Sequence, residues 1–180
     1  RQRQMCIRDS TCAVLEDRVA ALEGGVGALA VASGQAASAV AIQNLATNGD
    51  NIVASAHLYG GTYNLFKNVL SDMGIEVRFV DPADPNNFAE ATDDKTRAYY
   101  GEVLPNPSFE VFPISEVAEI GRPLGIPLIV DNTAAPVICK PFDHGAAISM
   151  HSTTKFIGGH GTSIGAVSYT HLTLPTILLV

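Results

Sequence analysis

Short apolar runs rich in β-formers alternate with longer segments of helical period between Val14 and Val167. This alternation is typical of βαβ units, in which helices join parallel strands and cover the sheet. The expected strands are residues 28–32, 51–55, 75–80, 96–103, 127–130 and 147–151. The expected helices are residues 14–22, 36–45, 62–73 and 114–124. The sequence therefore predicts an α/β fold with a mainly parallel sheet covered by helices.

Composition narrows the choice of partners and compartment. A chain of 180 residues suits one domain. Its formal net charge of -7 gives no electrostatic reason to approach nucleic acid or an anionic membrane. The three cysteines lack CxxC spacing, and no apolar run reaches the roughly 20 residues of a membrane span. A cytoplasmic protein without nucleic-acid or membrane partners is expected.

A lysine surrounded by hydroxyl groups follows the last expected strand. Residues 150–156 read MHSTTKF, with Lys155 as the lysine, and the glycine-rich segment 158–163 reads GGHGTS. An amine in such a place can form a Schiff base with the aldehyde of pyridoxal-5′-phosphate (PLP) while hydroxyl and N–H groups hold the phosphate. The alternative is an ordinary solvated lysine in a loop.

A carboxylate ends another apolar strand, because residues 128–133 read LIVDNT. Ligands of parallel sheets bind at the carboxyl ends of the strands, which places Asp131 where it can meet a ligand. In PLP enzymes a carboxylate beside the pyridine nitrogen keeps that nitrogen protonated. A turn or helix-capping aspartate is the alternative interpretation of Asp131.

Two further segments fit the same chemistry. The Ser33-Gly34-Gln35 turn opens a helix, where free N–H groups favour an anion such as a phosphate, although a plain N-cap looks the same. Tyr59 lies beside Gly60 and Gly61 after a strand and could stack on a flat ring, or be a core tyrosine. The four segments occur in the order phosphate turn, aromatic ring, ring carboxylate, lysine.

Other cofactor sites fit the sequence poorly. Residues 158–163 lack the order of a P-loop, and the glycines at 24–27 precede a strand instead of following one, which is wrong for a dinucleotide fingerprint. His144, His151 and His160 have no zinc-motif spacing, and core or turn histidines are the expected alternative.

The four segments together resemble the cysteine and methionine metabolism family of PLP-dependent transsulfuration enzymes. The similarity covers roughly residues 14–167 and includes VASGQAA at 31–37, LYGGT at 58–62, VDNT at 130–133 and HSTTKF at 151–156. It implies the large domain of the fold type I group typified by aspartate aminotransferase. The family's C-terminal small domain is missing from this chain.

The resemblance also implies roles for individual residues. By that resemblance Lys155 carries PLP, Asp131 pairs with the pyridine nitrogen, and Tyr59 stacks on the ring and could help to protonate a leaving group. Asn106 would approach the ring hydroxyl. The other implied cofactor-binding residues are Ser33, Gly34, Gln35, Ser152 and Thr154, with Thr133 and Glu102 as further candidates.

Residues 156–165 are most similar to the O-acetylhomoserine sulfhydrylases within the family. The implied reaction is a γ-replacement in which sulfide displaces acetate from O-acetylhomoserine and gives homocysteine, a step of methionine and cysteine biosynthesis. A cystathionine γ-synthase or γ-lyase is an alternative, and so is a catalytically silent binding or oligomerisation fragment. Homotetramers built as dimers of dimers are implied for full-length family members.

Both ends depart from the family pattern. Residues 4–11 read QMCIRDST, where family members carry a Tyr-x-Arg block for the phosphate of the neighbouring subunit, and residues 169–180 resemble nothing expected there. The expected division is therefore a non-family flank at 1–12, a partial PLP-binding domain at 13–168 and a non-family apolar tail at 169–180. We expect both flanks to be unrelated to the native coding sequence.

Overall fold

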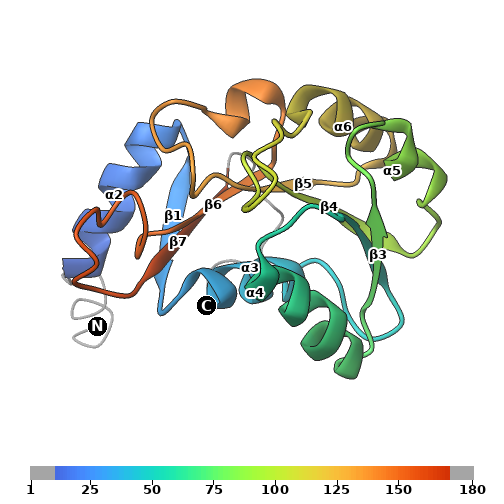
Figure 1. Ribbon diagram of the computed structural model, residues 1–180, viewed down its shortest axis with the longest axis horizontal. Coiled ribbons are helices and arrows are strands. Elements are labelled where there is room, and N and C mark those ends of the chain that lie inside the picture. Colours follow the sequence, from blue (N-terminus) through green and yellow to red (C-terminus); the bar gives the residue numbers. More distant parts are fainter. Residues whose placement is uncertain (1–10, 171–180) are drawn as a thin grey trace, which may run out of the picture.

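Seven strands form one sheet in the order β1-β7-β6-β5-β4-β2-β3 in the computed structural model, which describes residues 11–170 (Figure 1). In chain order they are β1 (Gly27–Val31), β2 (Asn51–Ser55), β3 (Glu76–Val80), β4 (Thr96–Glu102), β5 (Leu128–Asp131), β6 (Ile148–Ser152) and β7 (Ala166–Thr170). Neighbouring strands run parallel except where β7 pairs antiparallel with β1 and β6. The predicted mainly parallel sheet is confirmed.

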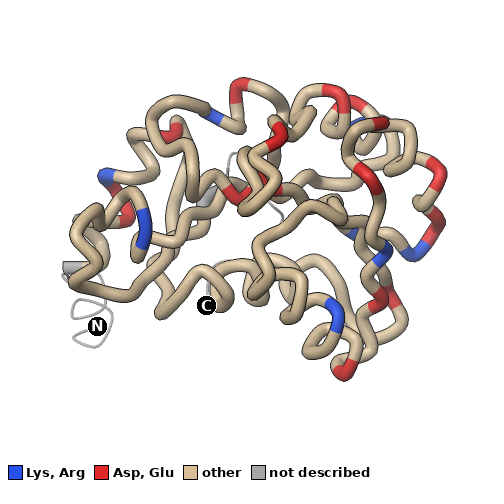
Figure 2. The backbone as a smooth tube through the Cα atoms, in the orientation of Figure 1, with Lys and Arg blue, Asp and Glu red and all other residues tan. Residues whose placement is uncertain are grey.

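Helices cover both faces of the sheet, as the alternating sequence pattern predicts. They are α2 (Thr11–Glu23), α3 (Gly34–Gln43), α4 (Gly60–Asn64) continuing into the π-helical η1 (Leu65–Leu70), α5 (Asn86–Glu90), α6 (Ile114–Gly121) and the 3₁₀ turns η2 (Arg122–Leu124) and η3 (Pro141–His144). One face carries α3, α4 and η1, and the other carries α2, α5 and α6 (Figure 1). Figure 2 shows α3 as a stretch without charged residues, in keeping with its position against the sheet.

Each face of the sheet has its own apolar core, because successive side chains of a strand point to opposite sides. In β5, Ile129 packs in the core under α3 and η1, while Leu128 and Val130 pack in the core under α6. Burying each such side chain contributes about 1.5–3 kcal/mol. The strands are thereby fixed in rotation, which decides the face on which every strand-end side chain emerges.

Helix α2 confirms one prediction and corrects another. It ends at Glu23, and Gly24 follows with a φ of 76°, as the Gly24-Gly25 pair in the sequence predicts for a helix end. The helical spacing of Val14, Leu15, Val19 and Leu22 predicts an apolar face. That prediction is wrong in part, because Val14 and Leu22 are exposed while Glu23 is 2% exposed. The Glu23 carboxylate lies inward because it accepts hydrogen bonds from Asn132 and Ser149.

Two further differences come from contacts distant in sequence. The helix expected at 62–73 begins at Gly60. Strand β7 was not predicted; it lies between β1 and β6 and buries Ala166 and Val167.

Most of the two expected non-family flanks lies outside the described residues. Of those flanks, residues 11–12 belong to α2 and residues 169–170 to β7. Within the described range 11–170, no helix is long and apolar enough to cross a membrane.

Candidate cofactor site

The parallel strands bring the predicted site residues to one edge of the sheet. Strands β2, β4, β5 and β6 all end there, and Glu102, Asp131 and Ser152 lie at or beside the last positions of three of them. Glu102 is the direct neighbour of Asp131 across β4 and β5, and Asp131 is the neighbour of Met150, two residues before Ser152. These three residues emerge on the α3 side, because they continue the rows of Tyr100, Ile129 and Met150 in the core under α3.

The turn that opens α3 packs directly against the end of β6. A methyl group placed on Gly34 would lie 3.1 Å from the Cβ of Ser152 and 3.4 Å from its Oγ. Ser33 caps the helix by accepting the N–H of Ala36. The N–H groups of Gly34 and Gln35 belong to the first turn, which has no acceptors within the helix. This cradle of amides and a serine hydroxyl fits a phosphate group.

Thr133 connects the ring-carboxylate candidate to the end of β6. Its main-chain N–H donates to Oδ1 of Asp131 at 2.9 Å, and its Oγ1 accepts the N–H of Ser152 at 2.8 Å. Burial raises the pKa of Asp131 above its ordinary value, while the bonds from Thr133 and the nearby His151 offset part of that rise. The bond from Thr133 therefore holds the Asp131 side chain in one orientation at the carboxyl end of β5.

Tyr59 begins α4 beside the same edge and is about half exposed. Its main-chain N–H donates to Oε1 of Glu102 at 2.9 Å. A methyl group on Gly61 would overlap the amide nitrogen of Gln35 and come within 2.6 Å of the Tyr59 ring. The predicted stacking residue and the predicted phosphate turn are thus neighbours in space.

Lys155 lies in the turn that follows β6, with its N–H donating to the carbonyl of Ser152 at 3.1 Å and its side chain exposed. Thr154 has a local role that the sequence did not predict. Its hydroxyl accepts the N–H of Gly165 at 3.1 Å and donates to the Gly165 carbonyl at 3.2 Å. These bonds close the base of the exposed loop between Lys155 and Gly165, so a phosphate contact by Thr154 stays a prediction.

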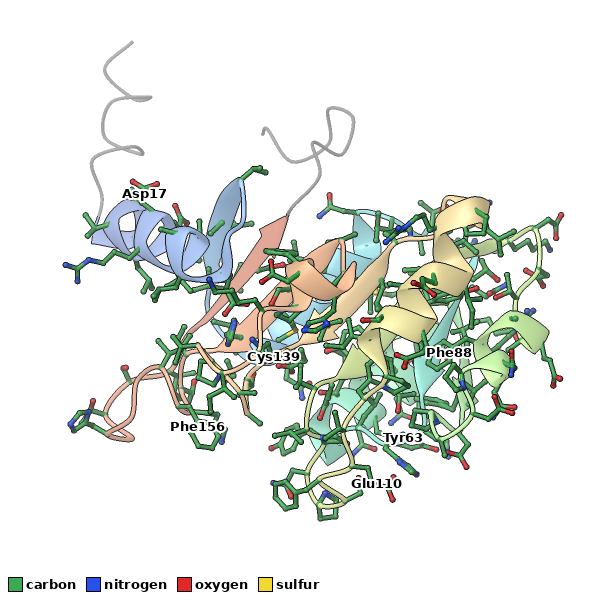
Figure 3. All side chains as sticks on the ribbon, turned by 90° about the horizontal axis from the view of Figure 1, so that it is seen from above. Asp17, Tyr63, Phe88, Glu110, Cys139 and Phe156 are labelled. Carbon is green, nitrogen blue, oxygen red and sulfur yellow. The ribbon has the colours of Figure 1, made fainter. Side chains whose placement is uncertain are left out.

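Asn106 lies on an exposed turn after β4, at the same edge of the sheet. The N–H of Phe109 donates to the carbonyl of Pro105 at 2.7 Å and closes this turn. The structure gives Asn106 no side-chain hydrogen bond to another described residue, so its contact with the ring hydroxyl stays a prediction. Figure 3 shows Glu110 of this loop and Phe156 of the loop after β6 along the same side of the molecule.

The histidines considered as metal ligands lie apart. His144 is 3.3 Å from the hydroxyl of Ser115, and His160 is bonded to the Gly158 carbonyl. His151 is buried on the opposite face of the sheet from Asp131, with its Nε2 3.2 Å from Oε1 of Glu23. Across residues 11–170, no three metal-ligating side chains gather into a site.

A buried polar cluster around Glu23 was missed by the sequence interpretation. The carboxylate accepts from Asn132 Nδ2 at 3.3 Å and from Ser149 Oγ at 3.2 Å, in addition to lying beside His151. A glutamate at the end of a helix is usually solvated, and no local pattern in the sequence indicated that Glu23 is buried. The cluster joins α2 to the strands that carry the site.

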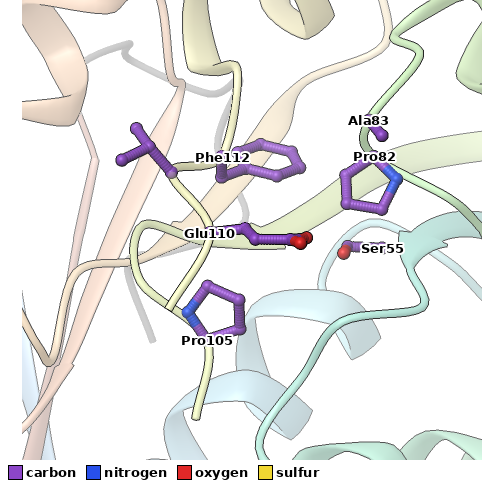
Figure 4. Close-up of a pocket in the computed structure, with 7 residues that line it drawn as sticks. Ser55, Pro82, Ala83, Pro105, Glu110 and Phe112 are labelled. Carbon is purple, nitrogen blue, oxygen red and sulfur yellow. The ribbon is translucent and has the colours of Figure 1, made fainter. Parts of the chain in front are cut away.

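A small hollow of about 170 Å³ opens near the site between the residues after β3 and the loop after β4 (Figure 4). Pro82 and Ala83 form one wall, and Glu110 and Phe112 form the other. None of the predicted cofactor-binding residues lines it.

Comparison with known proteins identifies the family of the chain. The family model described as Cys/Met metabolism PLP-dependent enzyme matches residues 6–173. An O-acetyl-L-homoserine sulfhydrylase from Leptospira meyeri is 52% identical over 162 residues, covering 89% of this chain and 37% of that protein. The homocysteine/cysteine synthase of Saccharomyces cerevisiae is 50% identical over 162 residues, covering 89% of this chain and 36% of that protein.

Solved structures give the same fold. A candidate O-acetylhomoserine (thiol)-lyase from Campylobacter jejuni, which carries a pyridoxyl-lysine-5′-monophosphate, matches with a TM-score of 0.87 and 37% identity over 89% of this chain and 40% of that one. The O-acetylhomoserine sulfhydrylase of Wolinella succinogenes matches with a TM-score of 0.82 and 40% identity over 89% of this chain and 46% of that one.

Fold and relatives together place the chain among the PLP-dependent enzymes. More specifically, the chain belongs to the Cys/Met metabolism PLP-dependent enzyme family. It spans little more than a third of the length of the curated relatives that it matches.

Proposed function

We propose that the protein takes part in an O-acetylhomoserine sulfhydrylase reaction, in which sulfide replaces acetate and homocysteine is formed. The observation that carries the proposal is the meeting of Gly34, Ser152, Asp131 and Tyr59 at one edge of the sheet. Relatives about half identical bear the names O-acetyl-L-homoserine sulfhydrylase and homocysteine/cysteine synthase. No comparable observation favours the cystathionine enzymes.

PLP would supply a positively charged ring that withdraws electrons from the bound amino acid. The α3 amides and the Ser152 hydroxyl would hold its phosphate, and the Asp131 carboxylate would hold the ring nitrogen in its protonated form. Lys155, at the start of the exposed loop after β6, would provide the amine for covalent attachment and for proton transfer. The Tyr59 ring would cover one face of the cofactor ring and exclude water from it.

Attachment of PLP can be tested directly. We expect borohydride reduction of the PLP-treated protein to leave a pyridoxyl adduct on Lys155, located by peptide mass spectrometry. Lys155→Ala should lose the adduct, whereas Lys140→Ala, which removes another exposed loop lysine, should keep it. An unmodified Lys155 would refute the proposal and favour a catalytically silent fragment.

Activity is the second test. Homocysteine formation from O-acetylhomoserine and sulfide should require PLP and should disappear in Lys155→Ala. Replacing sulfide with cysteine separates the reactions, because product from cysteine in place of sulfide would favour a cystathionine γ-synthase.

Self-association as a homotetramer in the cytoplasm completes the proposal. Large apolar side chains are exposed in the loops that follow β4, β5 and β6, namely Phe109, Val111, Val137, Ile138, Phe156 and Ile164. Exposed apolar surface of this kind marks sites covered by other protein surface. Light scattering after gel filtration should give four times the monomer mass, and a monomer over the micromolar range would contradict this part of the proposal.

A further inference from the structure

Glu102 is a buried carboxylate at the site, and it has no role in the proposed reaction. It is the last residue of β4, 6% exposed, and the direct neighbour of Asp131 in β5. Two carboxylates therefore lie side by side at the edge where the cofactor residues gather. Burying an acid without a functional or structural partner is costly, so its contacts indicate its role.

Glu102 fixes the start of α4. Tyr59 is the N-cap residue of that helix and has no side-chain oxygen that bonds the helix N–H groups. Oε1 of Glu102 accepts the Tyr59 N–H at 2.9 Å, and the hydroxyl of Thr62 also bonds the Glu102 side chain. An acid from a distant strand thus binds the N–H of the N-cap residue, as the glutamate of a capping box does.

This contact sets the place of the Tyr59 ring. The ring lies against Gly61, where an added methyl group would come within 2.6 Å of it and would overlap Gln35. With its main chain held by Glu102 and its ring against Gly61, Tyr59 has little freedom to leave the start of α3. The position of the ring beside the phosphate turn therefore depends on Glu102.

The proximity of the two acids also affects their pKa values. Burial, followed by the charge of Asp131, raises the pKa of Glu102 to about 8. Thr133 and His151 favour the charged form of Asp131. Burial, and then the charges of Asp131 and Glu102, raise the pKa of the nearby Tyr100. Burial and the neighbouring carboxylate both disfavour the charged form of Glu102. The hydrogen bonds from Tyr59 and Thr62 offset part of the rise in the pKa of Glu102.

We propose that Glu102 is a positioning residue: its side chain holds the main-chain N–H of Tyr59 and thereby keeps the Tyr59 ring beside the phosphate turn. The inference rests on the proposed function only in giving Tyr59 and Asp131 a cofactor to hold. Glu102 itself need not touch that cofactor.

The first test needs no cofactor. The amide signal of Tyr59 in ¹H–¹⁵N NMR spectra should move with pH, with a midpoint near 8, because its acceptor changes charge. Glu102→Gln should abolish this movement, since the amide oxygen still accepts the bond but does not titrate. Asp131→Asn should shift the midpoint to lower pH by removing the neighbouring charge. An unchanged titration in Glu102→Gln would overturn the inference, because it would show that Glu102 is not the acceptor of the Tyr59 N–H.

The second test measures the affinity for PLP at pH 7. Glu102→Gln imitates the neutral acid, so its dissociation constant should stay within about threefold of the original, whereas Glu102→Ala should weaken binding by about tenfold. Glu110→Ala removes an exposed acid from the same edge and should have no effect. Thermal melting without PLP checks that each variant is folded, and Glu102→Gln with the NMR titration keeps the test decisive if Glu102→Ala does not fold.

The outcomes separate the two proposals. An original protein that does not bind PLP would refute the proposed function and leave the NMR result valid. Normal PLP binding by Glu102→Ala would refute the positioning role alone.

Discussion

Gly34 and Ser152 approach so closely that a single methyl group on Gly34 would lie 3.1 Å from the Ser152 Cβ. Residues 118 positions apart in sequence therefore form one wall of the candidate phosphate site.

Gly34→Ala should weaken PLP binding by about tenfold, equal to about 1.4 kcal/mol, because the methyl group pushes Ser152 away from the α3 amides. Fluorescence or absorbance titration with PLP measures the change. Gly60→Ala is the matched control: Gly60 also opens a helix at this edge, but a methyl group there meets nothing within 4 Å. Equal affinities for the two variants would exclude the cradle.

Thr133→Val should lower the free energy of unfolding by about 1–3 kcal/mol, because the Ser152 N–H loses its acceptor in a partly buried place. Thr133→Ser keeps the oxygen and should remain close to the original protein. Urea unfolding measures both variants. A valine variant as stable as the serine variant would show that the bond contributes nothing.

Thr154→Val should loosen the loop that begins with Lys155, because both bonds between the hydroxyl and Gly165 are lost. We expect faster amide hydrogen exchange over residues 155–165 and a stability loss of about 1–2 kcal/mol. Thr154→Ser should exchange like the original. Unchanged exchange in the valine variant would mean that the main-chain contacts alone close the loop.

Glu23→Ala should destabilise the protein by about 3–5 kcal/mol, since it removes the common acceptor of Asn132 and Ser149 and the partner of His151. Glu90→Ala is a suitable control, because Glu90 also ends a helix but is exposed. Chemical unfolding distinguishes them. Similar losses for both would argue against the buried cluster.

Stability should fall as pH rises from about 4.5 to about 8. The folded protein keeps a proton on Glu102 in this range, whereas the unfolded chain releases it. The raised pKa of Glu102 therefore stabilises the folded protein fully below about pH 4.5, and this stabilisation is lost as the pH rises to about 8. The effect should reach a few kcal/mol, and Glu102→Gln should flatten the profile. Asp131, whose pKa is also raised, acts in the same direction. Urea unfolding between pH 5 and 8.5 measures how the free energy of unfolding changes with pH. A free energy of unfolding that rises with pH would contradict the assignment of the raised pKa to Glu102.

Local patterns predicted much of the fold. The apolar runs that became β2 and β5 and the glycine that ends α2 are visible in the sequence, because side-chain alternation and backbone freedom are properties of neighbouring residues. The helix expected from residue 62 starts at Gly60, directly after Tyr59, whose N–H is held by Glu102 about forty positions later. No local pattern encodes such a contact.

By itself, the sequence determined the α/β class, the strand-end positions of Asp131 and Ser152, and the lysine that follows them, since these depend on residues adjacent in the chain. Only the tertiary structure decided that β7 enters antiparallel between β1 and β6, that Glu102 lies beside Asp131, and that Glu23 turns inward toward His151. Those features depend on hydrogen bonds and packing between segments distant in sequence, and such contacts form only when the strands pair in the sheet.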